Sequence, residues 1–160
     1  MAAHVDRSGV EPARCLTLKS KSAISHVSKM RGVSILTIPI HHDERGSLLA
    51  FDARQSLPFD LKRCYFIWGC PEGKSRAGHS VSAPMALIVL RGWVTVDLDN
   101  ACEQLAIELS TPNRMVCIEA GVWLRLRDFS ADALLAVASP AYYEDIQYFD
   151  SPQPALLQRA

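Results

Sequence analysis

The feature that most constrains this chain is a succession of short apolar segments that begins at Val33 and is interrupted by Gly, Pro, Asp and Asn. Segments of this length are too short for typical helices and suit β-strands, and their regular spacing is typical of a sandwich or barrel. The expected strands are Val33–Ile40, Ser47–Asp52, Arg63–Gly69, Ala86–Leu90, Trp93–Asp97, Gln104–Leu109, Arg114–Ile118, Trp123–Arg127 and Ala133–Ala138. The pattern therefore predicts an all-β fold.

Two tight turns support antiparallel pairing of these strands. Arg91-Gly92 and Asp99-Asn100 each lie between apolar segments, and Gly, Asp and Asn tolerate the backbone angles that hairpins require. Between the two turns, polar and apolar residues alternate in WVTVDL, so one strand face is expected to be buried while the other meets solvent, a cavity or a partner.

The length and the residue distribution predict one domain with two tails. A chain of 160 residues suits a single core. Residues 1–31 carry six Lys and Arg against two acidic residues and show little apolar periodicity, which predicts a flexible basic N-terminal tail. This tail is either an arm that binds an anion or a partner, or an extension without function. We expect the domain at residues 32–150 and a C-terminal tail at 151–160.

Charge and hydropathy exclude several classes of partner. Seventeen basic residues balance seventeen acidic ones, so the whole chain offers no electrostatic reason to bind nucleic acid or an anionic membrane. No apolar run approaches the roughly 18 residues of a membrane span, and the N-terminus lacks the apolar part of a secretory signal. Five cysteines without close pairing fit reduced thiols, with Cys64 and Cys117 buried in strands. We expect a cytoplasmic protein.

Several motifs in unbroken order from about Val33 to Phe149 make the chain resemble a known family. They are DERGSLLAFD (43–52), LPFDLKRCYFI (57–67), RAGH (76–79), GVW (121–123), DFS (128–130) and ASPAYY (138–143). Together they are similar to the cupin-type dTDP-sugar 3,4-ketoisomerases, the WxcM-like family that includes FdtA and QdtA. The resemblance implies a cupin jelly-roll, a double-stranded β-helix of two antiparallel sheets, that assembles as a homodimer.

The resemblance also implies the reaction. Such enzymes move the carbonyl of dTDP-4-keto-6-deoxyglucose from C4 to C3 without a metal or other cofactor, as a step of deoxysugar and surface-glycan biosynthesis. The chemistry requires a base for the C3 proton, groups that hold the enediolate oxygen, and an acid that returns a proton to C4.

Four residues match family positions that serve this chemistry. His79 matches the first histidine of a His-x-His pair and is the expected base, since much of an imidazole is neutral near pH 7. Arg45 and Arg76 match arginines near the sugar or its diphosphate, and a guanidinium suits phosphate oxygens. Tyr65 is expected to hydrogen-bond a sugar hydroxyl or the diphosphate. Each has a structural alternative: a core histidine, a surface or turn arginine, a core tyrosine.

Other family positions have changed in this chain. Val81 stands where the family has the second histidine, Met85 and Ala86 replace a Glu-Gln pair, and Trp123-Leu124-Arg125 replaces Trp-His-Glu. These changes leave His79 alone of the usual metallocupin ligands, whereas a metal needs three or four, so no metal site is expected. His41 and His42 stand side by side near a strand end, where one of them could enter the pocket.

Two functions therefore stay open at the level of sequence. The first is a nucleotide-sugar 3,4-ketoisomerase or a close variant. The second is a non-catalytic binding protein of the same fold, which would use the arginines to hold a nucleotide sugar beside an inert, apolar pocket. Deuterium incorporation at C3 or C4 of the ketosugar distinguishes them, because only proton transfer exchanges those positions.

Overall fold

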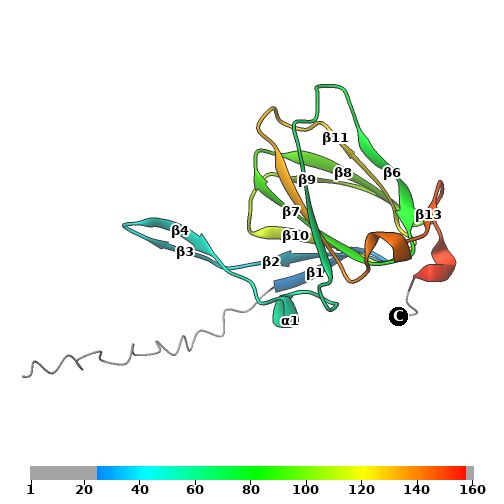
Figure 1. Cartoon of the computed structure of the whole chain (residues 1–160), viewed down its shortest axis with the longest axis horizontal. Helices are drawn as coiled ribbons and strands as arrows, with labels where there is room; N and C mark the ends of the chain where they lie inside the picture. The colour runs from blue at the N-terminus through cyan, green and yellow to red at the C-terminus, as the bar shows by residue number, and fades with distance from the viewer. Residues whose placement is uncertain (1–24, 158–160) are drawn as a thin grey trace, which may run out of the picture.

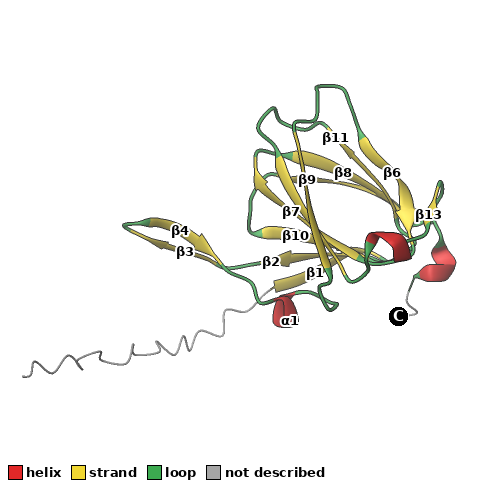
Figure 2. Cartoon of the chain, viewed as in Figure 1, coloured by secondary structure: helices red, strands yellow, loops and turns green. Residues whose placement is uncertain are grey.

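The computed structural model describes residues 25–157, which form two large antiparallel sheets and one separate hairpin (Figures 1 and 2). The first sheet has the strand order β1-β2-β10-β7-β12-β5, and its strands are β1 (Ser25–Met30), β2 (Val33–Thr37), β10 (Arg114–Ile118), β7 (Met85–Arg91), β12 (Leu134–Ser139) and β5 (Arg63–Trp68). The second sheet has the order β13-β6-β11-β8-β9, with β13 (Tyr148–Phe149), β6 (Arg76–Val81), β11 (Trp123–Arg127), β8 (Val94–Asp99) and β9 (Gln104–Leu109).

The remaining elements lie at the edges of this sandwich. The hairpin of β3 (Ile40–Asp43) and β4 (Gly46–Leu49) projects away from the two sheets (Figure 1). The described helices are short: α1 (Ala53–Ser56), η1 (Tyr143–Asp145) and η2 (Pro154–Leu156). No helix in the described part of the chain is long and apolar enough to cross a membrane.

The main core lies between the two sheets and follows from alternation along the strands. On β8, Val94, Val96 and Leu98 are buried while the residues between them are partly exposed. They pack in one cluster with residues of the opposing sheet such as Leu87 and Leu135. The predicted all-β fold with two antiparallel sheets is therefore confirmed.

Both ends of the described chain are more ordered than the sequence indicated. The prediction that the first strand starts near Val33 is wrong, because residues of the expected basic tail form β1, which pairs with β2 through its backbone. Residues 1–24 of that tail lie outside the described residues. At the other end, Leu157 joins the core and the Gln153 amide donates to the Gly121 carbonyl, so residues 151–157 pack against the domain.

The bounds of three strands agree with the prediction, whereas β8 (Val94–Asp99) lies slightly later than the expected Trp93–Asp97. β9, β10 and β11 begin and end as predicted. The expected strand Val33–Ile40 instead divides into β2 and the start of β3. Of the two cysteines expected to be buried, Cys117 is in the core, where burial raises the pKa of its thiol to about 12, whereas Cys64 is exposed on β5.

Candidate active site

A cavity of about 190 Å³ lies between the two sheets. The first sheet contributes residues of β5, β7 and β12, and the second contributes residues of β6, β11 and β13. The lining consists of Arg63, Tyr65, Ile67, Arg76, Ala77, His79, Met85, Leu87, Leu124, Leu126, Val137 and Tyr148. Three of the four residues expected from the sequence, His79, Arg76 and Tyr65, therefore meet in one cavity.

A bulge in β6 brings Arg76 and His79 to the same cavity. Residues three apart on a regular strand face opposite sides. Here Ala77 and Gly78 have φ of 62° and 85°, and the pairing of β6 with β11 shifts register at this point. The extra residue turns the strand, so both side chains line the cavity.

His79 is a half-buried imidazole with mostly apolar surroundings. It lies opposite Leu124 in the pairing of β6 with β11, and the Tyr148 ring contacts it edge to face, with 4.9 Å between the ring centroids and an interplanar angle of 78°. Burial disfavours the imidazolium and lowers the pKa of His79 from its ordinary value. A neutral imidazole at neutral pH is the form that can accept a proton.

Beside the imidazole, β5 presents a cation and a phenol. The Arg63 guanidinium lies 4.5 Å from the Tyr65 ring centroid and 5.0 Å from that of Tyr143. Burial is the main cause that raises the pKa of Tyr65, opposed by the Arg63 charge. The phenol therefore stays protonated and able to donate a hydrogen bond. A base, a neutral donor and two arginines thus surround one small space.

Sequence analysis missed two of these residues, Arg63 and Tyr148. A signal for Arg63 was present, because it is two residues from Tyr65 on a strand and must share its face. Tyr148 had no comparable signal, since β13 has only two residues and its place beside β6 depends on the path of the chain after β12.

Arg45 lies outside this cavity. It sits at the tip of the β3–β4 hairpin, where its side chain is 83% exposed and forms an ion pair with Asp43. That pair lowers the pKa of the Asp43 carboxyl through its hydrogen bonds with Arg45. His41 and His42 lie on the same projecting hairpin and do not line the cavity, and His42 shares a hydrogen bond with Ser47.

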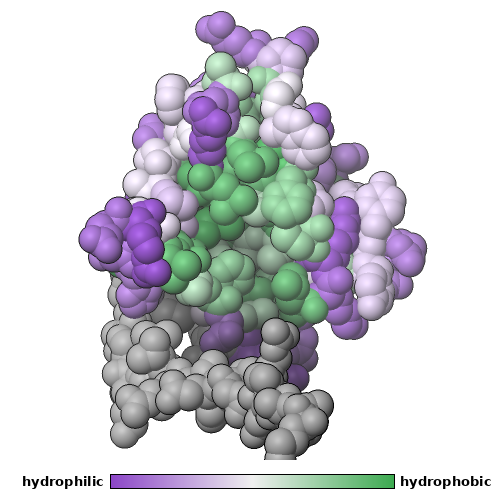
Figure 3. Space-filling view, turned by 60° about the vertical axis from the view of Figure 1, so that its left-hand side comes forward, coloured by the Kyte–Doolittle hydropathy of each residue, from purple (hydrophilic) through white to green (hydrophobic). Residues whose placement is uncertain are grey.

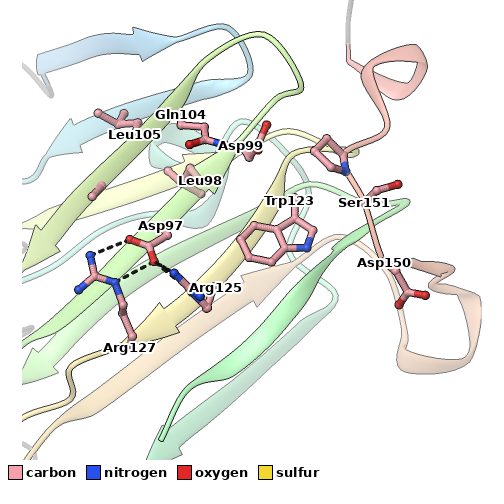
Figure 4. Close-up of a pocket in the computed structure, with 12 residues that line it drawn as sticks. Asp97, Leu98, Asp99, Gln104, Leu105, Trp123, Arg125, Arg127, Asp150 and Ser151 are labelled. Carbon is pink, nitrogen blue, oxygen red and sulfur yellow. Dashed lines mark hydrogen bonds and ion pairs between the residues drawn. The ribbon is translucent and has the colours of Figure 1, made fainter. Parts of the chain in front are cut away.

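Only two of the changed family positions line the cavity. Met85 and Leu124 do so, whereas Val81 shares the inward face with His79 but belongs to the packed core. Ala86 packs in the cluster on the outer side of the first sheet. Arg125 points to the outer face of the second sheet (Figure 4). The other changed positions therefore do not alter the lining of this cavity.

The outer face of the second sheet carries a wider, more open groove of about 700 Å³ (Figure 4). Its charged residues are largely paired with one another: the Asp97 carboxylate accepts hydrogen bonds from both Arg125 and Arg127. These bonds, that from Arg127 above all, lower the pKa of Asp97. The network joins β8 to β11, and we assign it a structural role.

Metal ligands do not gather in the described part of the chain. Among residues 25–157, no three or more His, Cys, Asp or Glu side chains come together in a way that would hold a metal ion. The cavity instead offers one imidazole, phenols and guanidinium groups, which are suited to proton transfer and to binding an anion.

Comparison with known proteins gives one consistent result. The FdtA family (WxcM-like, C-terminal) matches residues 31–155. A TDP-4-oxo-6-deoxy-α-D-glucose-3,4-oxoisomerase of Aneurinibacillus thermoaerophilus is 31% identical over 107 residues, which cover 66% of this chain and 77% of that protein.

Solved structures similar to this chain include enzymes of the same class. The QdtA sugar 3,4-ketoisomerase of Thermoanaerobacterium thermosaccharolyticum, in complex with TDP, has a TM-score of 0.71 and 30% identity, covering 75% of this chain and 88% of that one. A 3,4-ketoisomerase of Helicobacter canadensis has a TM-score of 0.71 and 28% identity, covering 76% and 92%.

Proposed function

The chain belongs to the FdtA family (WxcM-like, C-terminal), and from this premise we propose that it is a TDP-sugar 3,4-ketoisomerase of deoxysugar biosynthesis. It moves the carbonyl of a TDP-4-keto-6-deoxyhexose from C4 to C3. The observation that carries the proposal is the cavity in which His79 lies beside Arg76 and Tyr65.

The chemistry needs one base and a set of donors. His79 removes the C3 proton, and the electrons of that bond form a C3–C4 double bond with negative charge on O4. Tyr65, Arg63 and Arg76 stabilise this enediolate by hydrogen bonds and positive charge. The O3 proton then passes to O4, the carbonyl forms at C3, and the imidazolium returns its proton to C4. Atoms and charge balance, and His79 ends neutral.

A single imidazole suits a cavity in which Leu124 stands where relatives have a histidine. C3 and C4 are bonded neighbours, so a base above one carbon also reaches the other on the same face of the sugar. The partly buried phenol of Tyr65 fits the remaining task, because a neutral hydroxyl both donates and accepts a hydrogen bond and thus links O3 to O4.

The non-catalytic alternative is less well supported. It draws on the apolar Met85 and Leu124, but a binding protein has no need of a base, and burial keeps His79 in its basic form.

The decisive experiment follows the protons. The purified protein is incubated with TDP-4-keto-6-deoxyglucose in deuterated water, and NMR spectroscopy follows C3 and C4. We expect the 3-keto product. It should carry deuterium at C4 in those molecules for which the imidazolium exchanged its proton with solvent before returning it. Binding of TDP without any product or exchange would support the non-catalytic alternative.

We also propose a homodimer, supported by an exposed apolar surface on the outer side of the first sheet. Because β5 residues alternate, Phe66 and Trp68 face outward and are 52% and 67% exposed, and Leu90 of β7 is 44% exposed. Figure 3 shows apolar side chains gathered on the side of the molecule that bears the hairpin. A surface of this kind is typical of a protein interface.

The hairpin adds a reason for a second copy. Arg45 cannot serve its own cavity from the projecting hairpin, so we propose that it binds the ligand's charge in the cavity of the partner subunit. Light scattering tests the assembly: Trp68→Asp should give monomers, whereas Trp93→Asp should stay dimeric, because Trp93 is an exposed tryptophan in the turn between β7 and β8. A wild-type monomer at all concentrations would refute the dimer.

The cellular location proposed is the cytoplasm. The four cysteines among the described residues are free thiols, as is usual for proteins of a reducing compartment. The occurrence of nucleotide sugars as the substrates of related enzymes agrees with this assignment.

A further inference from the structure

Tyr148 is the one aromatic side chain whose ring contact with His79 is resolved in the described part of the chain. It comes from β13, which pairs with the same strand that carries His79. Tyr148 lies opposite Val81, two residues beyond His79, and the two side chains are diagonal neighbours on one sheet face. This arrangement explains the edge-to-face contact.

We propose that Tyr148 is a positioning residue: its ring fixes the His79 imidazole in the cavity and keeps water from its outer side. In the described structure, Tyr148 lines the cavity and contacts the imidazole while it is 47% exposed, so its ring lies between His79 and solvent. The role of Tyr148 in turnover rests on the proposed isomerase function, but its effect on the free imidazole does not.

The backbone around Tyr148 is fixed well enough for such a role. The Ser82 amide donates to the Gln147 carbonyl at 3.0 Å, and the Gln147 amide donates to the Ser82 hydroxyl at 2.9 Å. Just beyond the C-terminal end of β13, the Ser80 hydroxyl donates to the Ser151 carbonyl at 2.7 Å. These bonds hold β13 against β6, so the ring is carried on a rigid support.

The residues around His79 indicate what lowers its pKa. Its charged and titratable neighbours along the cavity are Arg63 and Tyr65 of β5, Arg76 of β6 and Tyr148 itself, while β7 and β11 contribute Met85, Leu87, Leu124 and Leu126. Burial is the one cause found for the lowered pKa of His79. Removal of the covering ring should therefore admit water and raise that pKa toward its ordinary value of about 6.5.

The test compares Tyr148→Leu, which removes the ring but keeps an apolar side chain, with Tyr148→Phe, which keeps the ring. NMR titration of the free protein follows the imidazole, and the His79 signal is identified by its loss in His79→Asn. In Tyr148→Leu we expect an upward shift of the His79 pKa and a parallel shift of the acidic limb of kcat/KM. Tyr148→Phe should preserve the wild-type titration.

Turnover provides a second measurement. A displaced base should lower kcat by roughly ten- to a hundredfold with little change in the affinity for TDP. Tyr142→Leu is the matched control, because Tyr142 is exposed on the same segment but does not line the cavity, and it should match the wild type.

Three results would overturn the proposal. One is a His79 titration that does not change in Tyr148→Leu. Another is a loss in Tyr148→Phe as large as in Tyr148→Leu, which would assign the effect to the hydroxyl. The third is an equal loss in Tyr142→Leu. An inactive wild-type protein would instead refute the isomerase function and leave the titration test intact.

Discussion

Replacing His79 with Asn tests the base directly, and the structure sets the size of the effect. Asn keeps a similar polar volume but cannot accept a proton from carbon. The remaining proton-transfer groups of the cavity are phenols, because arginine does not deprotonate in proteins. With its pKa raised above the ordinary value of about 10, the Tyr65 phenol is ionised to less than about one part in a thousand at pH 7.

No other group in the cavity can therefore replace the imidazole efficiently. Loss of a general base costs about 10²- to 10⁴-fold in rate. Because very little of the Tyr65 phenol is ionised, it is a poor substitute base, and we expect a loss in the upper half of this range. We expect His79→Asn to lower kcat about 10³-fold or more, which corresponds to roughly 4 kcal/mol of transition-state stabilisation.

The assay measures product formation together with deuterium exchange at C3 and C4. A single base predicts that both carbons lose exchange to the same extent. TDP affinity, measured by calorimetry, should change little, because Arg63 and Arg76 are untouched and Asn keeps the space filled. If His79→Asn retains more than a tenth of the wild-type rate, or if exchange persists at one of the two carbons, a second base acts and the single-imidazole mechanism is wrong.

Three further predictions concern pH, ligand binding and stability. The proton acceptor is the neutral imidazole, so kcat/KM should fall with decreasing pH around a midpoint below 6.5, and a midpoint above 7 would contradict the burial of His79. Arg76→Ala should weaken TDP binding roughly tenfold or more, whereas Arg125→Ala on the outer face should leave calorimetric affinity unchanged. Gly92→Ala should lower the free energy of unfolding by about 2–4 kcal/mol in urea titrations, because φ is +69° and the added Cβ would lie 2.0 Å from a side-chain oxygen. Gly73→Ala, with φ of +72° and open space, should cost only about 1–2 kcal/mol.

The parts of the fold that the sequence predicts well are those governed by alternation. β8, β9 and β11 bury every second residue, and the sequence carries that period directly. β1 and β13 are held instead by backbone pairing, β1 with β2 and β13 with β6. Their own residues show no apolar alternation and therefore carry little signal. The same limit explains why the sequence predicts a tail where residues 25–30 form a strand.

Site residues could be predicted where a suitable residue type lies in a family motif. They were harder to predict where the path of the chain decides which side chains reach the cavity. His79, Arg76 and Tyr65 were expected to meet and do line one cavity, although their roles stay predictions. Arg45 has the right chemistry but lies on a projecting hairpin, a placement that no local pattern reveals. Tyr148 reaches the cavity only because the chain returns to β6 after β12.

The bulge in β6 connects these observations to the mechanism. Without it, Arg76 would face away from His79, and the cavity would lose one of the two cations that can balance an enediolate or a diphosphate. The cost of the bulge is two residues at positive φ, one of them the non-glycine Ala77, and such strain persists where the surrounding structure holds it. A strand that served only the core would gain nothing from this distortion. Its presence where cation and imidazole share one face therefore favours a ligand-binding cavity over a strand that serves the core alone.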